Sequence, residues 1–82
     1  MPSALDLFGK KVKLLRIERR LSQEKLAAMC AVHRNYIGRV ERGKTNIKFD
    51  RLMKLAGGLR VRPAELLKLI PKPAPPEPHD MK

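Results

Sequence analysis

The stretch LSQEKLAAMCAVHRNYIGRVERGK, residues 21–44, decides the fold because it indicates two short helices joined by a tight turn. Ser22 is a favourable N-cap for the first of these helices, which is expected to end near Cys30. Residues 31–32 form the turn. A second helix is expected over about Arg34–Arg42, followed by a glycine, which is a common helix stop. Two helices in this arrangement make a helix-turn-helix.

Apolar residues recur at helical spacing on both sides of this unit. Those from Phe8 to Leu15 predict a first helix over about Leu5–Arg20. After a polar loop, residues 49–56 indicate a fourth helix, which the two glycines that follow are expected to weaken or end. Proline favours the start of a fifth helix at Pro63, where the apolar residues up to Ile70 spread over more than one face. No segment shows a strand pattern, so we expect a compact all-α domain of five helices.

The net positive charge of the chain lies in this helical domain. Nineteen Lys and Arg oppose eight Asp and Glu, which gives a net charge of +11 over 82 residues. The segment PKPAPPEPHDMK, residues 71–82, carries two lysines and two acids and five of the seven prolines, and it is expected to form a neutral flexible tail after a folded domain of residues 1–70. An excess of this sign favours a nucleic acid or an anionic membrane surface as partner.

Several other classes of protein fit the sequence poorly. No run of about 18 apolar residues could span a bilayer and no secretion signal is visible, so a membrane is disfavoured and a cytoplasmic location is expected. Ser3, Ser22 and Cys30 lack recognisable histidine and carboxylate partners, so we expect no enzyme. With one cysteine and only His33 and His79, neither a metal site nor a cofactor is implied. Cys30 is expected to be a buried core residue.

The motifs LSQEKLA, YIGRVERGK and LAGGLRVRPAELL resemble those of the Cro/repressor-type (XRE) helix-turn-helix regulators, and the resemblance covers roughly Gly9–Ile70. Within that family the small controller proteins of restriction-modification systems are most similar in size and in the run HRNYIGRVERG. The resemblance implies a lambda-repressor-like fold and a sequence-specific regulator of transcription. Such a regulator binds a palindromic operator in double-stranded DNA as a homodimer, and it blocks or recruits RNA polymerase there.

The second helix of the motif carries the side chains expected to read bases. Arg34, Asn35, Gly38 and Arg39 match the family positions that face the major groove. The chemistry agrees, because Arg can bind guanine at O6 and N7 and Asn can bind adenine at N6 and N7, while Gly38 would allow close approach. For the two arginines, contact with phosphate or plain solvation is the alternative.

A larger set is expected to contact the DNA backbone. Its members are Gln23, His33, Tyr36, Arg42, Lys44, Thr45, Asn46 and Lys48. Tyr36 could instead pack on the preceding helix. His33, Lys48 and Arg62 stand where Ser, Thr or Asp would normally cap a helix. Our hypothesis is that the first two exchange capping for phosphate contact and that Arg62 is tolerated.

The resemblance also implies structural features. Arg16 is expected to pair with Glu41, the one acid of an otherwise basic helix, and Ala27 is expected where two helices cross closely. Arg20 and Ala31 occupy positions where the family often has glycine. We expect the turn at Ala31 to be slightly reshaped, because a left-handed backbone costs alanine about 1–2 kcal/mol.

A dimer interface is expected on the fourth and fifth helices and their link, with Leu59, Val61, Leu66 and Leu69 as candidates and the monomer core as the alternative for each. Two other functions were considered beside the dimeric regulator. An antitoxin would bind a toxin protein and repress its own operon. A nonspecific nucleic-acid or RNA binder would need only charge, but the chain offers few stacking aromatics.

Overall fold

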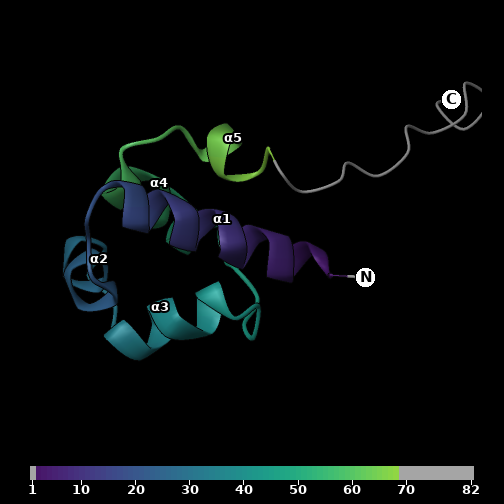
Figure 1. The fold of residues 1–82 in the computed structure, drawn as a ribbon, viewed down its shortest axis with the longest axis horizontal. Coiled ribbons are helices and arrows are strands. Elements are labelled where there is room, and N and C mark those ends of the chain that lie inside the picture. Colours follow the sequence, from purple (N-terminus) through teal and green to yellow (C-terminus); the bar gives the residue numbers. More distant parts are fainter. Residues whose placement is uncertain (1, 69–82) are drawn as a thin grey trace, which may run out of the picture.

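The computed structural model describes residues 2–68. Within these residues the regular secondary structure consists of helices joined by turns and loops, without strands (Figure 1). The helices are α1 (Ala4–Glu18), α2 (Gln23–Met29), α3 (Arg34–Glu41), α4 (Phe49–Leu59) and α5 (Pro63–Leu66). The expected five-helix, lambda-repressor-like, all-α fold is therefore confirmed. The expectations for Leu69, for Ile70 and for the tail of residues 71–82 lie outside the described residues.

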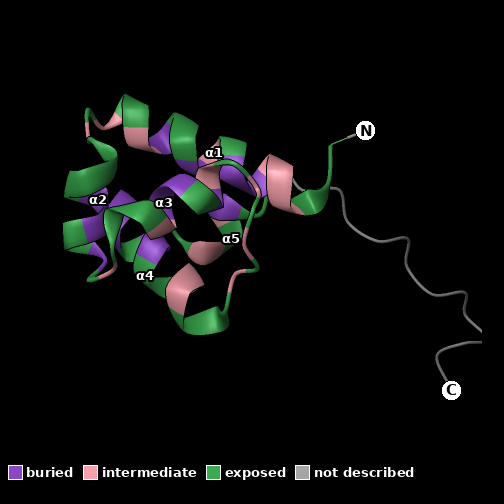
Figure 2. Cartoon of the chain, turned by 90° about the horizontal axis from the view of Figure 1, so that it is seen from below, coloured by how far each residue is buried: buried purple, intermediate pink, exposed green. Residues whose placement is uncertain are grey.

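α1 runs through the middle of the molecule, with α3 along one side and α5 near the other (Figure 1). α2 lies at one end and leads into α3, and the most extensive helix contacts are those of α3 with α2 and with α1. The buried residues lie on the faces that the helices turn toward one another, and the exposed residues cover the outside (Figure 2). The helix-turn-helix is thus held against the long first helix.

The core draws on all five helices. Leu26, Ile37, Leu55 and Leu59 are almost completely buried, and each such side chain contributes about 1.5–3 kcal/mol of hydrophobic stabilisation. The remaining buried apolar residues are Phe8, Val12, Leu15, Ala27, Cys30, Val40, Ala56 and Leu66. The apolar face expected for the first helix and the packing role expected for Ala27 are confirmed.

The first helix begins with a capping box that the sequence analysis missed. The backbone N–H of Asp6 donates to Ser3 Oγ at 3.1 Å, and the backbone N–H of Ser3 donates to Asp6 Oδ2 at 3.0 Å. The hydrogen bond from the Ser3 backbone stabilises the carboxylate and is the main reason why the pKa of Asp6 lies below its usual value. α1 consequently starts one residue earlier than expected, and it ends two residues earlier than Arg20.

Three helix ends use a left-handed backbone without glycine. Arg20, Ala31 and Arg60 have φ values of 56°, 56° and 58°. The expectation that the turn at Ala31 would be reshaped is wrong, because Ala31 adopts the left-handed conformation itself and the next N–H, of Val32, donates to the carbonyl of Ala27 at 3.0 Å. The strain is retained because that hydrogen bond closes the helix end.

Glycine has two different roles in α4, which continues through Gly57 and Gly58 instead of ending there as expected. A Cβ atom at Gly58 would lie 2.7 Å from Cys30 Sγ and 3.1 Å from Leu26 Cδ1, so this glycine lets α4 approach α2 closely. A Cβ atom at Gly57 would meet nothing within 4 Å. Packing at Gly58 therefore outweighs the low helix propensity of the pair.

Two further glycines fix α3 against α1. A Cβ atom at Gly9 would collide with the backbone carbonyls of Val40 and Glu41, so α1 crosses the end of α3 with no side chain between them. Gly43 has a φ of 68°, and its α-carbon lies against Asp6 in the first turn of α1. The end of α3 and the start of α1 are therefore in direct contact.

Candidate nucleic-acid interface

The outer face of α3 presents three side chains to solvent. Arg34, Asn35 and Arg39 are all exposed. Arg34 lies 3.7 Å from Glu24, but both side chains are more than 60% exposed, at 65% and 77%, so this ion pair contributes at most about 1 kcal/mol and is easily exchanged for another anion. The positions expected to read bases from the resemblance are thus accessible, apart from Gly38.

Gly38 is buried on the same helix. With Gln23, Arg34, Asn35 and Arg42 it lines a shallow hollow between α2 and α3. A Cβ atom at Gly38 would lie 3.1 Å from Arg42 Nη1 and 3.6 Å from Gln23 Oε1. The missing side chain therefore makes room for the protein's own guanidinium and amide, a role that the sequence analysis did not foresee.

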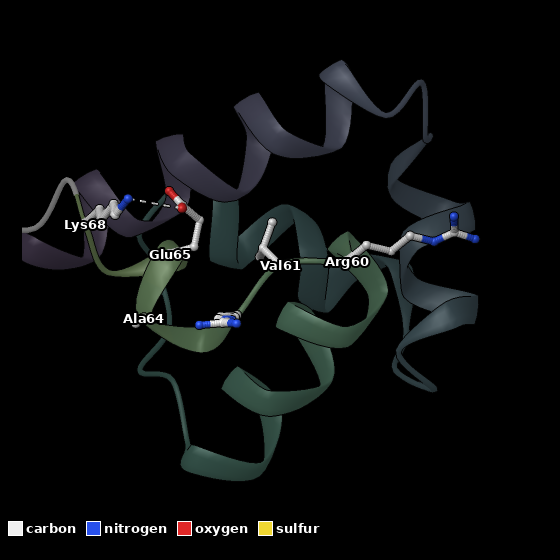
Figure 3. A pocket seen from close by; sticks show the side chains of 6 residues that line it. Arg60, Val61, Ala64, Glu65 and Lys68 are labelled. Carbon is white, nitrogen blue, oxygen red and sulfur yellow. Dashed lines mark ion pairs between the residues drawn. The ribbon is translucent and has the colours of Figure 1, made fainter.

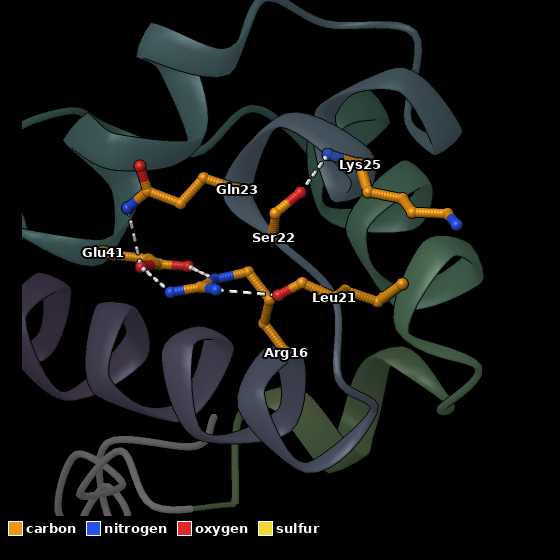
Figure 4. Close-up of polar contacts among 6 residues, drawn as sticks. All are labelled: Arg16, Leu21, Ser22, Gln23, Lys25 and Glu41. Carbon is orange, nitrogen blue, oxygen red and sulfur yellow. Dashed lines mark hydrogen bonds and ion pairs between the residues drawn. The ribbon is translucent and has the colours of Figure 1, made fainter.

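An ion pair joins the end of α3 to α1 (Figure 4). Arg16 Nε donates to Glu41 Oε2 at 2.6 Å and Arg16 Nη2 donates to Glu41 Oε1 at 3.1 Å, while Arg16 Nη1 donates to the carbonyl of Leu21 at 2.8 Å. The two charged side chains are only 12% and 4% exposed. The pair expected from the resemblance is present, and its forked geometry fixes the orientation of α3.

The amide of Gln23 is part of the same network, because Gln23 Nε2 donates to Glu41 Oε1 at 3.0 Å (Figure 4). This residue starts α2 directly after Ser22, whose Oγ accepts the backbone N–H of Lys25 at 3.0 Å. Ser22 is thus the N-cap of α2, as expected. Gln23, expected only as a phosphate contact, also links α2 to the end of α3.

His33 is a better cap than the sequence analysis expected. Its Nδ1 atom accepts the backbone N–H of Asn35 at 3.1 Å, so the hypothesis that it gives up capping for phosphate contact is wrong in its first half. The imidazole can accept this hydrogen bond because Nδ1 lies two bonds from Cβ, as the side-chain oxygen of asparagine does. Lys48 and Arg62 make no side-chain capping bond, as expected.

A second hollow lies between α3 and the start of α4. Its lining consists of Tyr36, Thr45, Asn46, Lys48 and Arg51. The guanidinium carbon of Arg51 lies 5.1 Å from the centre of the Tyr36 ring, within cation–π range. The Tyr36 hydroxyl is buried and has no hydrogen-bond partner in residues 2–68. Burial raises the pKa of Tyr36, and a buried hydroxyl agrees with the packing alternative for this residue.

Two of the residues expected at a dimer interface lie in the core of the monomer. Leu59 and Leu66 are fully buried in the monomer core at 0% exposure, because α4 and α5 pack them against α1, so they are not free to contact a second chain. Val61 is half-buried and lines a hollow at the link between α4 and α5 (Figure 3). Phe49 and Met53, one turn apart on α4, are exposed instead, at 76% and 45%.

The hollow at this link is polar around Val61. The Glu65 carboxylate lies 3.4 Å from Lys11 Nζ and 3.3 Å from Lys68 Nζ (Figure 3). The hydrogen bond from Lys68 has the larger effect and the one from Lys11 adds to it, and together they lower the pKa of Glu65. Arg60 and Arg62 complete the rim. Among the described residues that line this hollow, Glu65 is the one acid, and it is paired with two lysines.

Cys30 lies in the core, as expected. Its thiol is buried and donates to the backbone carbonyl of Lys54 at 3.3 Å, and burial raises the pKa of the thiol. In residues 2–68 no three His, Cys, Asp or Glu side chains gather as metal ligands would. None of the helices described is both long and apolar enough to cross a membrane.

Fold and surface together define a helix-turn-helix domain with an exposed cationic face on its second helix. Residues 12–66 match the HTH_3 helix-turn-helix family, and the chain therefore belongs to this family. It is an XRE-type, DNA-binding regulator of transcription and not an enzyme, similar to the controller proteins of restriction-modification systems.

Three relatives illustrate the similarity. Control protein C.BamHI of Bacillus amyloliquefaciens is 45% identical over 62 residues, which cover 74% of this chain and 76% of that protein. Control protein C.SmaI of Serratia marcescens is 37% identical over 62 residues, which cover 76% of this chain and 74% of that protein. The crystal structure of the restriction-modification controller protein C.AhdI from Aeromonas hydrophila has a TM-score of 0.74 at 42% identity and covers 76% of this chain and 94% of that one.

Proposed function

We propose that this protein regulates restriction-modification genes by binding a palindromic operator in double-stranded DNA as a homodimer. The observation that carries the proposal is the outer face of α3, where Arg34, Asn35 and Arg39 are exposed while the Arg16–Glu41 pair fixes the helix from behind. Preorganised donors on a helix of this size fit the major groove. The names of the controller proteins to which the chain is similar support the choice of target genes.

With α3 in the major groove, a second set of residues would contact the sugar-phosphate backbone of the DNA. Gln23 and His33 lie at the starts of α2 and α3, where helix N-termini attract phosphate. Arg42 and the loop with Lys44, Thr45 and Asn46 follow α3, with Lys48 at the start of α4. These residues position the domain on the duplex without reading its sequence.

We place the dimer contact on α4 and its link to α5. A single domain makes few base contacts, and a two-fold dimer doubles them on a palindrome. The exposed Phe49 and Met53 replace the buried Leu59 and Leu66 as candidates, beside the half-buried Val61 and with Leu69 beyond the described residues. A bound dimer would act in the cytoplasm, by blocking RNA polymerase or recruiting it.

The test is selection of bound sites from a randomised duplex library, followed by titration of the selected site. We expect a palindromic consensus whose half-sites lie about one helical turn apart. Arg39→Ala should abolish the preference at one position in each half-site, whereas Lys44→Ala should weaken binding to every sequence alike. If no consensus emerges and affinity depends on salt alone, the proposal is wrong and a nonspecific binder is favoured.

The same preparation tests the antitoxin alternative. An antitoxin would bind a protein encoded beside it with an affinity that does not depend on operator DNA. Co-expression of the neighbouring genes, followed by size-exclusion chromatography, separates the two functions, because a regulator of restriction-modification genes elutes as a dimer without that protein.

A further inference from the structure

The hollow between α3 and α4 contains a cation to which neither the sequence nor the resemblance assigned a role. Arg51 is the third residue of α4, and Tyr36 is the third residue of α3. Their side chains meet across the hollow, with 5.1 Å between the guanidinium carbon and the ring centre. Arg51 is therefore held in place by a neighbour from another helix, unlike the fully exposed cations around it.

A cation–π contact does not supply a hydrogen-bond acceptor for the N–H groups of the guanidinium. The N–H groups lie in the plane of the group and remain free to donate, in a fork that matches two oxygens of a phosphate. No carboxylate of residues 2–68 pairs with Arg51, and none of the side-chain hydrogen bonds among those residues involves it. The edge of the guanidinium is thus available within the part of the chain that the structure describes.

The surroundings of this edge suit an anion. Lys48 adds a second positive charge, and Thr45 and Asn46 add a hydroxyl and an amide. Lys48, the N-cap of α4, makes no side-chain capping bond, so the backbone N–H groups of the first turn of α4 have no side-chain acceptor. Asp50 is exposed and forms no ion pair within residues 2–68. A phosphodiester bound in this hollow would lie near two cations, two polar side chains and a helix start.

Tyr36 contributes its ring and not its hydroxyl. The hydroxyl oxygen is buried and has no partner in the described residues, whereas the ring carries the stacked guanidinium. A hydroxyl in this state costs about 1–3 kcal/mol compared with a satisfied one, so its removal should not harm the fold.

We propose that Arg51 binds one backbone phosphate of the bound duplex through the edge of its guanidinium, while the Tyr36 ring positions the group from its face. The inference rests on the proposed function and adds Arg51 to its backbone contacts. It also replaces the hydroxyl contact that the sequence analysis allowed for Tyr36.

The test is a fluorescence-anisotropy titration of the selected operator duplex at several salt concentrations. Arg51→Ala should weaken binding about tenfold or more, as expected for loss of a hydrogen bond to a charged group. It should also lower the slope of log K against log salt by about 0.9 for each protomer bound. Arg51→Lys should keep the slope and recover only part of the affinity, because an ammonium group has no fork.

Variants of the tyrosine separate ring from hydroxyl. Tyr36→Phe should bind as the parent does, and Tyr36→Leu should weaken binding. The double variant Tyr36→Leu with Arg51→Ala should bind no more weakly than Arg51→Ala alone, because both changes remove one contact. Lys13→Ala, which removes an exposed cation of α1, is the control and should leave the affinity within about twofold.

Two results would overturn the inference. The first is an Arg51→Ala variant with the parental affinity and salt slope. The second is a Tyr36→Phe variant that loses as much affinity as Tyr36→Leu, because the hydroxyl would then be the contact. Since Arg51 lies at the surface, its variants should fold, and thermal melts verify this. A parent protein that selects no consensus would contradict the proposed function, which is a different outcome.

Discussion

Replacement of Glu41 with alanine should lower the stability of the domain substantially, because the change leaves a buried guanidinium without its counter-charge. Arg16 is only 12% exposed, and Glu41 accepts two of its N–H groups at 2.6 and 3.1 Å as well as the amide of Gln23. Removal of one partner from a buried ion pair costs about 3–5 kcal/mol. A domain of this size has about 5–15 kcal/mol of stability in total, so the loss would be a large share.

Thermal unfolding followed by circular dichroism measures the effect. For a domain of 60–100 residues, 1 kcal/mol shifts the Tm by about 4–8 °C, so Glu41→Ala should unfold at a temperature lower by about 12–40 °C. Glu24→Ala is the matched control, because it removes the exposed acid that pairs with Arg34 at 3.7 Å. That change should cost no more than about 1 kcal/mol.

The same variant should also weaken operator binding when it is measured well below its melting temperature, because the pair orients α3. A Tm for Glu41→Ala within a few degrees of the Tm of Glu24→Ala would refute the reasoning. The network would then be solvated in solution, and its short distances would contribute nothing to the fold. Arg16→Met combined with Glu41→Leu adds a check, since replacing both charges with apolar groups should restore much of the lost stability.

Four further predictions test other parts of the structure. Gly57→Ala should stabilise the domain by about 0.5–1 kcal/mol in urea unfolding, since the site is helical and open. Gly58→Ala should destabilise it by about 1–3 kcal/mol through overpacking. Equal effects of the two variants would contradict the close approach of α2 and α4. Ala31→Gly should raise the urea midpoint by relieving the left-handed alanine, and a lower midpoint would show that the conformation is not strained. His33→Ala should lose about 0.5–2 kcal/mol and His33→Ser should keep most of it, so identical losses would argue against capping. Folding lowers the pKa of Asp6, so the ionised carboxylate stabilises the fold at pH values above its unfolded pKa of about 4. The difference in Tm between the parent and Asp6→Ala should therefore become smaller as the pH falls below that value. A difference that persists in acid would exclude the capping box as its cause.

The helices themselves could be predicted from the sequence because their signals are local. Spacing of apolar residues places the inward face of α1, and Ser22 and Gly43 mark boundaries that depend on a few neighbouring atoms. The same reasoning placed Cys30 in the core. Each of these inferences needs only a helical period or a cap, and the structure has both.

Contacts between helices could not be predicted in this way. The glycine pair in α4 is unfavourable for a helix when it is considered alone, and the side chains of Leu26 in α2 and of Cys30 at its end explain why Gly58 is there. Leu59 and Leu66 look like interface residues in the sequence, and only the packing of the helices shows that they are buried in the monomer. The Arg16–Glu41 pair was expected from resemblance alone, because nothing local brings residues 25 positions apart together.

The candidate site shows the same division. The exposure of Arg34 and Arg39 follows from the face of one helix, and that part could be predicted. The stacking of Arg51 on Tyr36 depends on how α4 turns back toward α3, and no motif of the sequence indicates it. Contacts that join two elements required the structure.

The contact of Gly43 with Asp6 has a practical consequence for how the protein should be handled. It brings the beginning of α1 beside the loop that follows α3, and Lys44 lies close enough to Asp6 to contribute to lowering its pKa. An affinity tag fused directly ahead of Ser3 would therefore emerge next to this loop, where a histidine-rich or charged peptide would compete with a duplex or add cations of its own. Measured affinities and salt slopes would then describe the tag as much as the domain, so the tag should be cleaved before any titration.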